Sequence, residues 1–452
     1  EHCTTLQHTS LWRRRLKNFQ VFSYLRERLG ASSLVRNFVM IATASMVGQV
    51  ILIAVMPLLT RLFTPAEFGI AATGLAGAQL ATSVAGWRFE WFVPNAKSEP
   101  EASRLLMLAT IALIVIVSLL VPFIWMYFDD SIGQSKVFLF CIFLCIVART
   151  GVKIVESWFV RVANLAFVSV GKLINSIVEA ASSLVAGLAG FGAAGLMIAY
   201  ALAPAVAFGF LFTVLWVRQW DAANRPNFRG IEISQVHQTW REYHWSATVA
   251  TAASAVNSMS MTMMLFALGY VFDASQLGFF ALVRRMTLMP VSLVSNALSQ
   301  SFWAQAAKQV REGKYLQLRS SYLRITKLLG GASIVLATVC YLASKLIIYV
   351  FGSQWAPAGP ILIAMIPYLI GLLMFSPTNH LIVFNRQDLQ IFIDGTRILL
   401  VLISAVLALK LNLSLVITVW LMSISSLIGH VLLFLLQLTL QNRLADRISP
   451  GG

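Results

Sequence analysis

The sequence predicts an all-α polytopic membrane protein with about twelve transmembrane helices. Of its 452 residues, 58% are hydrophobic and only 12% are charged, whereas soluble domains carry about 25% charged residues. Apolar runs near the roughly 20 residues that a helix needs to cross the hydrocarbon recur along the chain, and a barrel would show short alternating segments instead. We expect spans near residues 37–60, 69–92, 105–127, 137–157, 166–188, 193–217, 246–268, 277–302, 325–349, 361–383, 390–410 and 413–437.

The distribution of positive charge predicts how these spans are oriented. Of the 34 Lys and Arg residues, four fall inside spans, and four lie in connections on one side of the predicted membrane: Arg61, Lys136, Lys345 and Lys410. The others lie on the opposite side, which the positive-inside rule assigns to the cytoplasm together with both termini. The net charge of +16 therefore indicates membrane orientation and not nucleic-acid binding.

Two segments of the sequence share one skeleton. Residues 60–72 read TRLFTPAEFGIAA and residues 269–281 read GYVFDASQLGFFA, so that Phe63 and Phe272 stand 209 residues apart. Each segment joins an odd-numbered span to the next even one, so the first six spans resemble the last six. Because six is even, both halves share one orientation, related by a pseudo-twofold axis along the membrane normal. Two six-helix lobes of this kind are the architecture of an alternating-access transporter.

The predicted domains follow from this repeat. The chain starts with a basic amphipathic segment whose apolar residues recur at helical spacing, as in helices that lie on anionic membrane lipids. The longest polar stretch after it marks the boundary between the lobes. We expect a cytoplasmic segment at 1–35, an N-lobe at 36–217, a cytoplasmic linker at 218–244, a C-lobe at 245–440 and a cytoplasmic tail at 441–452.

Ionisable residues inside membrane spans are costly and are candidates for function. The fifth span places Lys172, Asn175 and Glu179 on one face. Glu179 is either a protonation site or counter-ion of a cavity, or a neutral buried acid. The fourth span ends with Arg149, Lys153 and Glu156, which line a cationic vestibule if their face meets the fifth span, and otherwise form a solvated helix end.

The eighth span carries two arginines. Arg284 and Arg285 lie within two turns of Gly278, too deep for ordinary interfacial residues, and Asn296 follows on the face of Arg285. An arginine at this depth can grip a phosphate through two parallel hydrogen bonds. The alternative is that both side chains extend toward the outer surface.

Other polar residues in spans favour structural roles. A continuous helix would place Arg88 and Glu90 on opposite faces, where they cannot pair, whereas Asp394 and Arg397 at i, i+3 can. His380 and His430 are lone imidazoles, for which packing is favoured over proton coupling. Asp129 and Asp130 fall in a short outer loop without further carboxylates. Walker, GxSxG and HExxH motifs are absent from the sequence, so we expect no enzyme activity, metal or cofactor.

Several segments carry a family resemblance. They are PLLTRLFTPAEFGIAA at 57–72, WRFEWFVPNAKSEPEASRLL at 87–106, ASQLGFFALVRRMTLMPVSLVSNALSQSFW at 274–303, FGSQWAPAGP at 351–360 and SPTNHLIVFNRQ at 376–387. In this order the sequence resembles the Wzx-type lipid-linked oligosaccharide flippases of the multidrug/oligosaccharidyl-lipid/polysaccharide exporter superfamily. The resemblance covers both lobes.

The resemblance implies a function in surface polysaccharide biosynthesis, such as that of lipopolysaccharide O-antigen or exopolysaccharide. The protein would move undecaprenyl-pyrophosphate-linked oligosaccharide repeat units across the bacterial cytoplasmic (inner) membrane, with polysaccharide polymerase and chain-length regulator proteins as candidate partners. The expected site residues are Arg284, Arg285, Arg88 and Lys172 for the pyrophosphate, Asn175, Asn257 and Asn296 for sugar hydroxyls, and Glu179 for proton or ion coupling.

Two alternatives remain at this point. A multidrug exporter of the same superfamily would move organic cations, but such a cavity should be rich in carboxylates, and the spans hold one deep Glu against several Arg. A membrane-embedded polysaccharide polymerase or glycosyltransferase is the other. It is disfavoured by the short outer connections and by the lack of a paired acidic site.

Overall fold

The computed structural model describes residues 33–127, 135–216, 225–228, 230–379, 381 and 386–448, and within these ranges every regular element is a helix. Ten helices are long and apolar enough to cross a membrane, and two bent helix pairs bring the number to as many as twelve. This confirms the predicted all-α polytopic fold. The amphipathic part of segment 1–35, together with Asp129, Asp130 and His380, lies outside the described residues.

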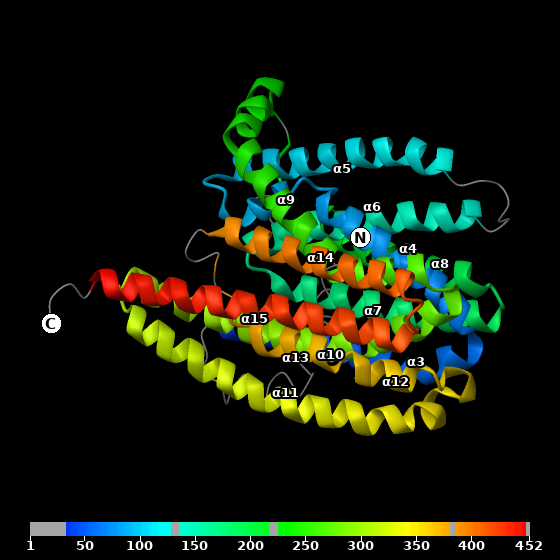
Figure 1. Cartoon of the computed structure of the whole chain (residues 1–452). Coiled ribbons are helices and arrows are strands. Elements are labelled where there is room, and N and C mark those ends of the chain that lie inside the picture. Colours follow the sequence, from blue (N-terminus) through cyan, green and yellow to red (C-terminus); the bar gives the residue numbers. More distant parts are fainter. Residues whose placement is uncertain are drawn as a thin grey trace.

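The N-lobe is a bundle in which α8 packs against both α6 and α7, and α3 lies along α7 (Figure 1). Its apolar helices bury small residues where they cross, such as Ala199, Ala201 and Ala203 of α8. The helices are α3 (Ser33–Leu62), α4 (Pro65–Val84), α5 (Glu99–Tyr127), α6 (Ser135–Arg161), α7 (Leu165–Leu188) and α8 (Gly192–Trp216).

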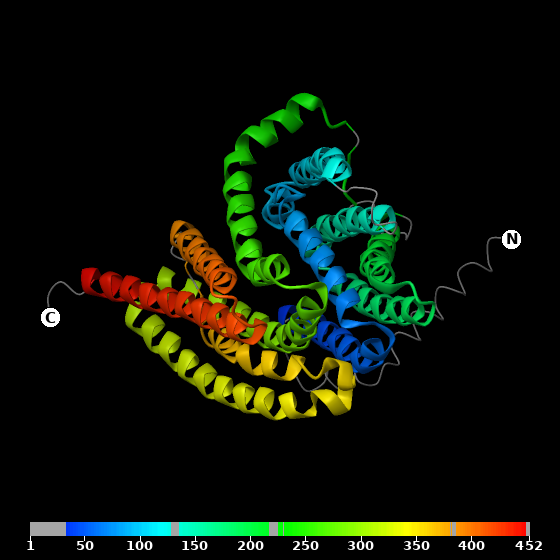
Figure 2. The ribbon, with the colours of Figure 1, turned by 45° about the vertical axis from the view of Figure 1, so that its right-hand side comes forward.

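In the C-lobe, α9 packs against α14, and α15 against α13 and α14. The helix α9 starts inside the stretch expected as a linker, so residues 233–244 are helical and continuous with the seventh span. Figure 2 shows α9 as a curved helix whose first half leans toward α5 of the N-lobe. The helices are α9 (Ile233–Val271), α10 (Ala274–Arg311), α11 (Tyr315–Phe351), α12 (Ala358–Ala364), α13 (Ile366–Phe375), α14 (Gln387–Lys410) and α15 (Leu415–Ile448).

Two predicted spans are broken. The expected helix 69–92 was wrong as a continuous element, because α4 ends at Val84 and Trp87 and Arg88 adopt positive φ values of 47° and 56°. A left-handed residue cannot continue a right-handed helix. The chain goes on as the 3₁₀ turns η1 (Phe89–Trp91) and η2 (Val93–Asn95), bent by 63° from α4. The tenth span also bends, by 49°, between η4 (Ser353–Trp355) with α12 and α13.

The two repeated segments each begin a helix. Thr64 and Glu67 form a capping box at the start of α4: the Thr64 amide donates to Glu67 Oε2 at 2.7 Å, and the Glu67 amide to Thr64 Oγ1 at 3.4 Å. At the start of α10, Asp273 Oδ1 accepts from the Gln276 amide at 2.9 Å. The polar residues of the skeleton therefore satisfy amides that a helix start leaves unpaired.

The glycines of the two segments cross each other. A Cβ on Gly69 would lie 2.1 Å from the carbonyl oxygen of Ala274, and one on Gly278 would lie 1.7 Å from that of Pro65. Ala274 and Gly278 are the counterparts of Pro65 and Gly69 in the repeat, so this contact is reciprocal. We call it the glycine crossing. It joins α4 to α10, the most extensive contact between the lobes.

Aromatic residues pack beside the glycine crossing. Trp355 lies edge-on to Phe68 at 5.3 Å and to Phe279 at 5.9 Å, and its Nε1 donates to the Thr60 carbonyl at 2.9 Å. The lobes are thus closed together at this end of the bundle. The other end, where α15 ends and where α5 and α11 begin, is called the basic end (Figure 1).

Candidate functional site

Charged side chains from both lobes gather inside the bundle. Lys153 interacts electrostatically with Arg88, Glu90 and Arg149, and Glu156 interacts with Lys172. Tyr200 does so with Arg149, Glu179 and Arg285, so the group is continuous. The inter-lobe charge cluster consists of Arg88, Glu90, Arg149, Lys153, Glu156, Lys172, Glu179, Tyr200 and Arg285. Its five cationic side chains outnumber its three carboxylates, which makes the cluster suited to an anionic ligand.

Arg285 connects the lobes. From α10 in the C-lobe, its Nη2 donates to Glu179 Oε1 on α7, and its Nη1 donates to the Tyr200 hydroxyl on α8. The side chains of Arg285 and Glu179 are 13% and 9% exposed. The Nε of Arg285 and the hydroxyl of Ser183, one turn beyond Glu179, are buried without a hydrogen-bond partner among the described residues. The donors of the guanidinium are therefore only partly used.

Arg88 makes a second connection between the lobes. Its Nη2 donates to the Ser254 hydroxyl on α9, and its guanidinium lies 4.4 Å above the ring of Trp91. Its Nη1 also lies 3.7 Å from Glu90 Oε1. The sequence pattern had predicted that these two residues do not form an ion pair. That expectation was wrong because it assumed a continuous helix, and the left-handed turn at Arg88 swings the two side chains together.

The other predicted site residues fall into different surroundings. Arg284 points away from Arg285 and donates through Nη2 to the Met261 carbonyl of its own lobe at 3.1 Å, because neighbouring helical residues point about 100° apart. The two arginines therefore form no common clamp in this conformation. Asn175 is half-buried on α7, one turn from Lys172. The side chain of Asn296 lies outside the described part of the chain.

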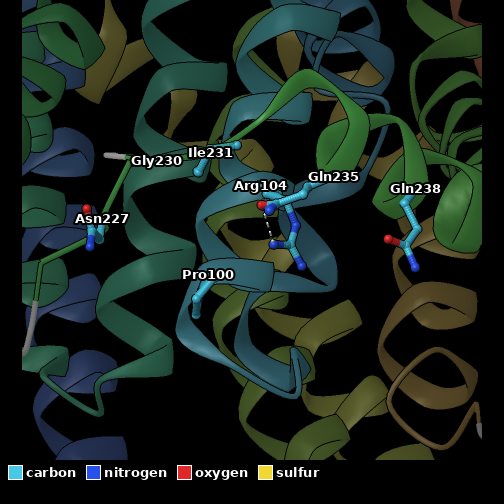
Figure 3. Close-up of a pocket in the computed structure, with 7 residues that line it drawn as sticks. All are labelled: Pro100, Arg104, Asn227, Gly230, Ile231, Gln235 and Gln238. Carbon is cyan, nitrogen blue, oxygen red and sulfur yellow. Dashed lines mark hydrogen bonds between the residues drawn. The ribbon is translucent and has the colours of Figure 1, made fainter.

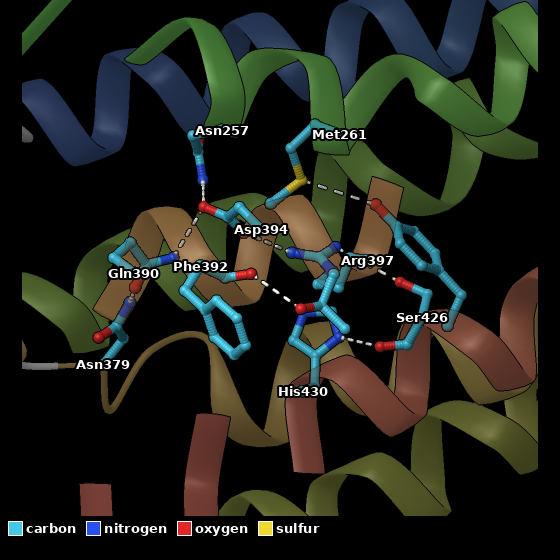
Figure 4. Close-up of polar contacts among 11 residues, drawn as sticks. Asn257, Met261, Asn379, Gln390, Phe392, Asp394, Arg397, Ser426 and His430 are labelled. Carbon is cyan, nitrogen blue, oxygen red and sulfur yellow. Dashed lines mark hydrogen bonds and ion pairs between the residues drawn. The ribbon is translucent and has the colours of Figure 1, made fainter. Parts of the chain in front are cut away.

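Asn257 belongs to a separate polar group inside the C-lobe (Figure 4). Its Nδ2 donates to Asp394 Oδ2 at 3.2 Å, and Asp394 Oδ1 pairs with Arg397 Nη1 at 3.2 Å. The predicted Asp394–Arg397 pair is thus confirmed. His430 is buried, with its Nδ1 2.8 Å from the Ser426 carbonyl, a packed position as expected. The C-lobe network consists of Asn257, Asn379, Gln390, Asp394, Arg397, Ser426 and His430.

A polar hollow of about 460 Å³ lies at the basic end, between the start of α5, the residues Asn227, Gly230 and Ile231, and the start of α9 (Figure 3). Its arginine, Arg104, is held by Thr239, to which Nε donates at 2.8 Å, and by Gln235. No member of the inter-lobe charge cluster lines it. The hollow also contains none of the site residues predicted from the sequence, whereas the cluster contains four of them. We therefore take the cluster as the candidate site.

The first half of α9 is fastened to the N-lobe beside this hollow. Tyr243 donates its hydroxyl to Glu101 Oε1 at 2.8 Å, and Lys97 Nζ lies 2.8 Å from Glu242 Oε1. The hydrogen bond to Glu242 raises the pKa of Lys97 above its ordinary value of 10.5. A helix of the C-lobe thus contacts both lobes.

Sequence reasoning missed Tyr200 and Ser254. Tyr200 is the one tyrosine of the apolar helix α8. A phenol hydroxyl inside such an apolar run needs a hydrogen-bond partner, and this could have marked Tyr200 as a member of a polar site. Ser254 lies in a stretch of α9 with many small residues and hydroxyls, which left nothing to single it out. Among the described residues, no group of three or more His, Cys, Asp and Glu could hold a metal ion.

Several solved structures of transport proteins share this fold. The lipid II flippase MurJ, in an inward closed conformation, superposes with a TM-score of 0.66 at 12% identity over 90% of each chain. An inward-facing multidrug resistance MATE family transporter of the MOP superfamily gives 0.60 at 13% identity, covering 92% of this chain and 99% of that one. A MOP superfamily transporter from Pyrococcus furiosus, described as having a binding pocket of reverse polarity, gives 0.58 at 15% identity, with 92% and 97% covered.

The apolar helices define a multi-pass membrane protein, and its fold is shared with the MOP-superfamily transporters and the flippase described above. Residues 58–360 match the polysaccharide biosynthesis protein family, and because this is more than half of the chain, the chain belongs to that family. No curated protein matches it in sequence. The structures with a similar fold are a flippase and transporters, and the absence of enzyme activity stays a prediction.

Proposed function

We propose that this protein is a flippase for undecaprenyl-pyrophosphate-linked oligosaccharide repeat units in the bacterial cytoplasmic membrane. The observation that carries the proposal is the inter-lobe charge cluster, a largely buried group with excess positive charge that draws its cations from both lobes. A pyrophosphate is compact and anionic, and it needs such donors once it leaves water. Membership of a polysaccharide biosynthesis family supports the same substrate class.

The mechanism follows from where the cations lie. With both termini cytoplasmic, the basic end faces the cytoplasm, where the lipid-linked unit is made. Arg285 and Arg88 reach across the lobe interface, and Lys172 and Lys153 extend the positive charge along the N-lobe. The headgroup enters among these cations while the polyprenyl tail stays in lipid. Rocking of the lobes then opens the glycine crossing and releases the headgroup in the outer leaflet.

The remaining site residues take secondary roles in this proposal. Asn175 and Asn296 contact sugar hydroxyls, and Arg284 joins the pyrophosphate site only after leaving the Met261 carbonyl. Asn257 must likewise leave Asp394 to reach a sugar. Glu179 is the candidate for proton or ion coupling. Polysaccharide polymerase and chain-length regulator proteins are the partners that would use the product.

The alternative substrate is an organic cation, because the MATE transporters share this fold. The charge balance of the cluster disfavours it. Each of its three carboxylates has a cation of the cluster nearby, Arg88 for Glu90, Lys172 for Glu156 and Arg285 for Glu179. A cationic drug would have to displace them.

Complementation with a glycan readout tests the proposal. The gene is deleted in its host, and wild type, Arg285→Ala, Arg88→Ala or the control Arg319→Ala is restored. Arg319 is exposed on α11 and outside the cluster. We expect wild type and Arg319→Ala to restore surface polysaccharide, and the other two variants to express but leave lipid-linked units inside the cell. Unchanged surface glycan on deletion, with altered sensitivity to cationic drugs, would establish the alternative instead.

A further inference from the structure

The Arg285 guanidinium has two competing uses. In this structure it is held by Glu179 and Tyr200 of the opposite lobe, whereas the proposed function requires it to bind phosphate. Because α10 belongs to the C-lobe and α7 and α8 to the N-lobe, any ligand that takes Arg285 from these partners also removes a contact between the lobes.

We propose that Glu179 is a positioning residue that stands in for the anionic ligand: it holds Arg285 across the lobe interface until a phosphate group displaces it. This inference rests on the proposed function and deepens it. Binding of the anion to the Arg285 guanidinium would therefore also break the contact that this side chain makes between the lobes.

The geometry of the pair suits displacement. The hydrogen bond from Arg285 reaches a single oxygen of Glu179, although a carboxylate can accept two parallel bonds from an arginine. The Nε of Arg285 and the nearby Ser183 hydroxyl are buried without partners in the described part of the chain. A phosphate can accept hydrogen bonds from two guanidinium N–H groups at once, and it can also accept one from a hydroxyl group. The incoming anion thus satisfies groups that Glu179 leaves unused.

Burial makes the exchange all-or-none. A buried charge without a counter-ion is strongly unfavourable, so Arg285 stays with Glu179 until another anion is in place. The charged and titratable groups that interact with Glu179 are Arg285 on α10, Tyr200 on α8 and Cys145 on α6. Arg149 donates to Cys145 and interacts with Tyr200, so a second cation of the cluster stays beside both neighbours of Glu179 after Arg285 has moved.

The test measures binding and lobe separation on the purified full chain in nanodiscs. Inorganic pyrophosphate is the probe for calorimetry. Spin labels at Val160→Cys on α6 and Leu316→Cys on α11, both exposed toward the basic end, report the distance between the lobes in a Cys3→Ser background. The variants are Glu179→Gln, Arg285→Lys and the control Asp388→Asn, an exposed acid on α14 outside the cluster.

We expect Glu179→Gln to bind pyrophosphate about tenfold more tightly than wild type, because its internal competitor is gone. Without ligand, the distribution of distances between the two spin labels in this variant should be broader than in wild type and should resemble that of wild type with pyrophosphate bound. Arg285→Lys should bind more weakly, since an ammonium cannot replace the fork. Asp388→Asn should match wild type.

The proposal would be overturned if Glu179→Gln bound pyrophosphate equally or more weakly than wild type. It would also be overturned if pyrophosphate binding left the distance between the lobes unchanged, or if neither wild type nor Glu179→Gln bound pyrophosphate. The proposed function fails independently. If Glu179→Gln binds pyrophosphate more tightly while deletion of the gene leaves surface glycan unchanged, the exchange stands and the oligosaccharide substrate does not.

Discussion

The inter-lobe charge cluster and the C-lobe network are both polar groups with buried charged residues, but they differ in how their charges are distributed. In the C-lobe network, one carboxylate and one guanidinium lie three residues apart on α14, with amide, hydroxyl and imidazole groups of the same lobe around them. In the inter-lobe cluster, the Arg285–Glu179 ion pair and the Arg88–Ser254 hydrogen bond join the two lobes, and cations are in excess. The first arrangement moves with one lobe as a unit, and only the second must change when the lobes move.

This difference separates stability from transport. Charges that are neutralised within one rigid lobe contribute to its packing whatever the conformation. Charges paired across a moving interface are re-exposed in each cycle and become available to a ligand. The comparison therefore supports the proposal that the substrate site is the cluster, although both regions carry ionisable residues inside the membrane.

The largest loss of stability is expected from Asp394→Ala. It leaves Arg397, whose side chain is 6% exposed, as an uncompensated charge inside the C-lobe, and breaking a buried pair on one side costs about 3–5 kcal/mol. Thermal unfolding in detergent measures the effect. The matched variant replaces both residues, Asp394→Leu with Arg397→Met, and should recover most of the stability and retain transport. Loss of transport in this double variant would give the network a functional role.

Gly278→Ala should have the next largest effect. Its Cβ would lie 1.7 Å from a backbone oxygen, which cannot rotate away, so α4 and α10 must separate at the glycine crossing. Overpacking of this kind costs about 1–3 kcal/mol. We expect the labelled lobes to shift and complementation to fail with both polar regions intact. Gly331→Ala on α11, where a Cβ meets open space, is the control. A fully active Gly278→Ala variant would show that this contact does not need to close.

Tyr200→Phe removes one hydroxyl from the cluster and keeps its ring below Arg285. A single hydrogen bond to a charged group contributes about 1.5–3 kcal/mol at most, and Glu179 still holds the guanidinium. We therefore expect a modest rise in pyrophosphate affinity, smaller than that of Glu179→Gln, in the same calorimetric assay. A larger rise than for Glu179→Gln would make Tyr200 the principal competitor.

The smallest effect is expected at the exposed pair of Lys97 and Glu242. The raised pKa of Lys97 means that its pairing favours the folded state below about pH 10 and that this contribution disappears as the pH rises through the folded-state pKa. Solvent screens the pair, so Lys97→Ala should leave the unfolding temperature unchanged within error at pH 7. A clear destabilisation there would indicate that the start of α9 contributes strongly to holding the lobes together.

Local features of the fold could be read from the sequence, because they depend on neighbours in the chain. The apolar runs identified the spans, and the spacing of Asp394 and Arg397 predicted their pair. The break after Val84 could not be read, since residues 85–92 are as compatible with a helix as those before them. It depends on how residues 87–95 pack against α5, α6 and α9.

The sequence by itself determined the all-α membrane fold, the repeat of two lobes and the list of charged residues buried in spans. These follow from hydropathy, period and charge, which are local. Only the tertiary structure decided that Arg285 meets Glu179, 106 positions away, that Arg284 turns to its own lobe, and that Asn257 is held by Asp394. Such partners depend on which helix faces pack together, and a cation inside a span can face a ligand, a counter-ion or a carbonyl with the same sequence pattern.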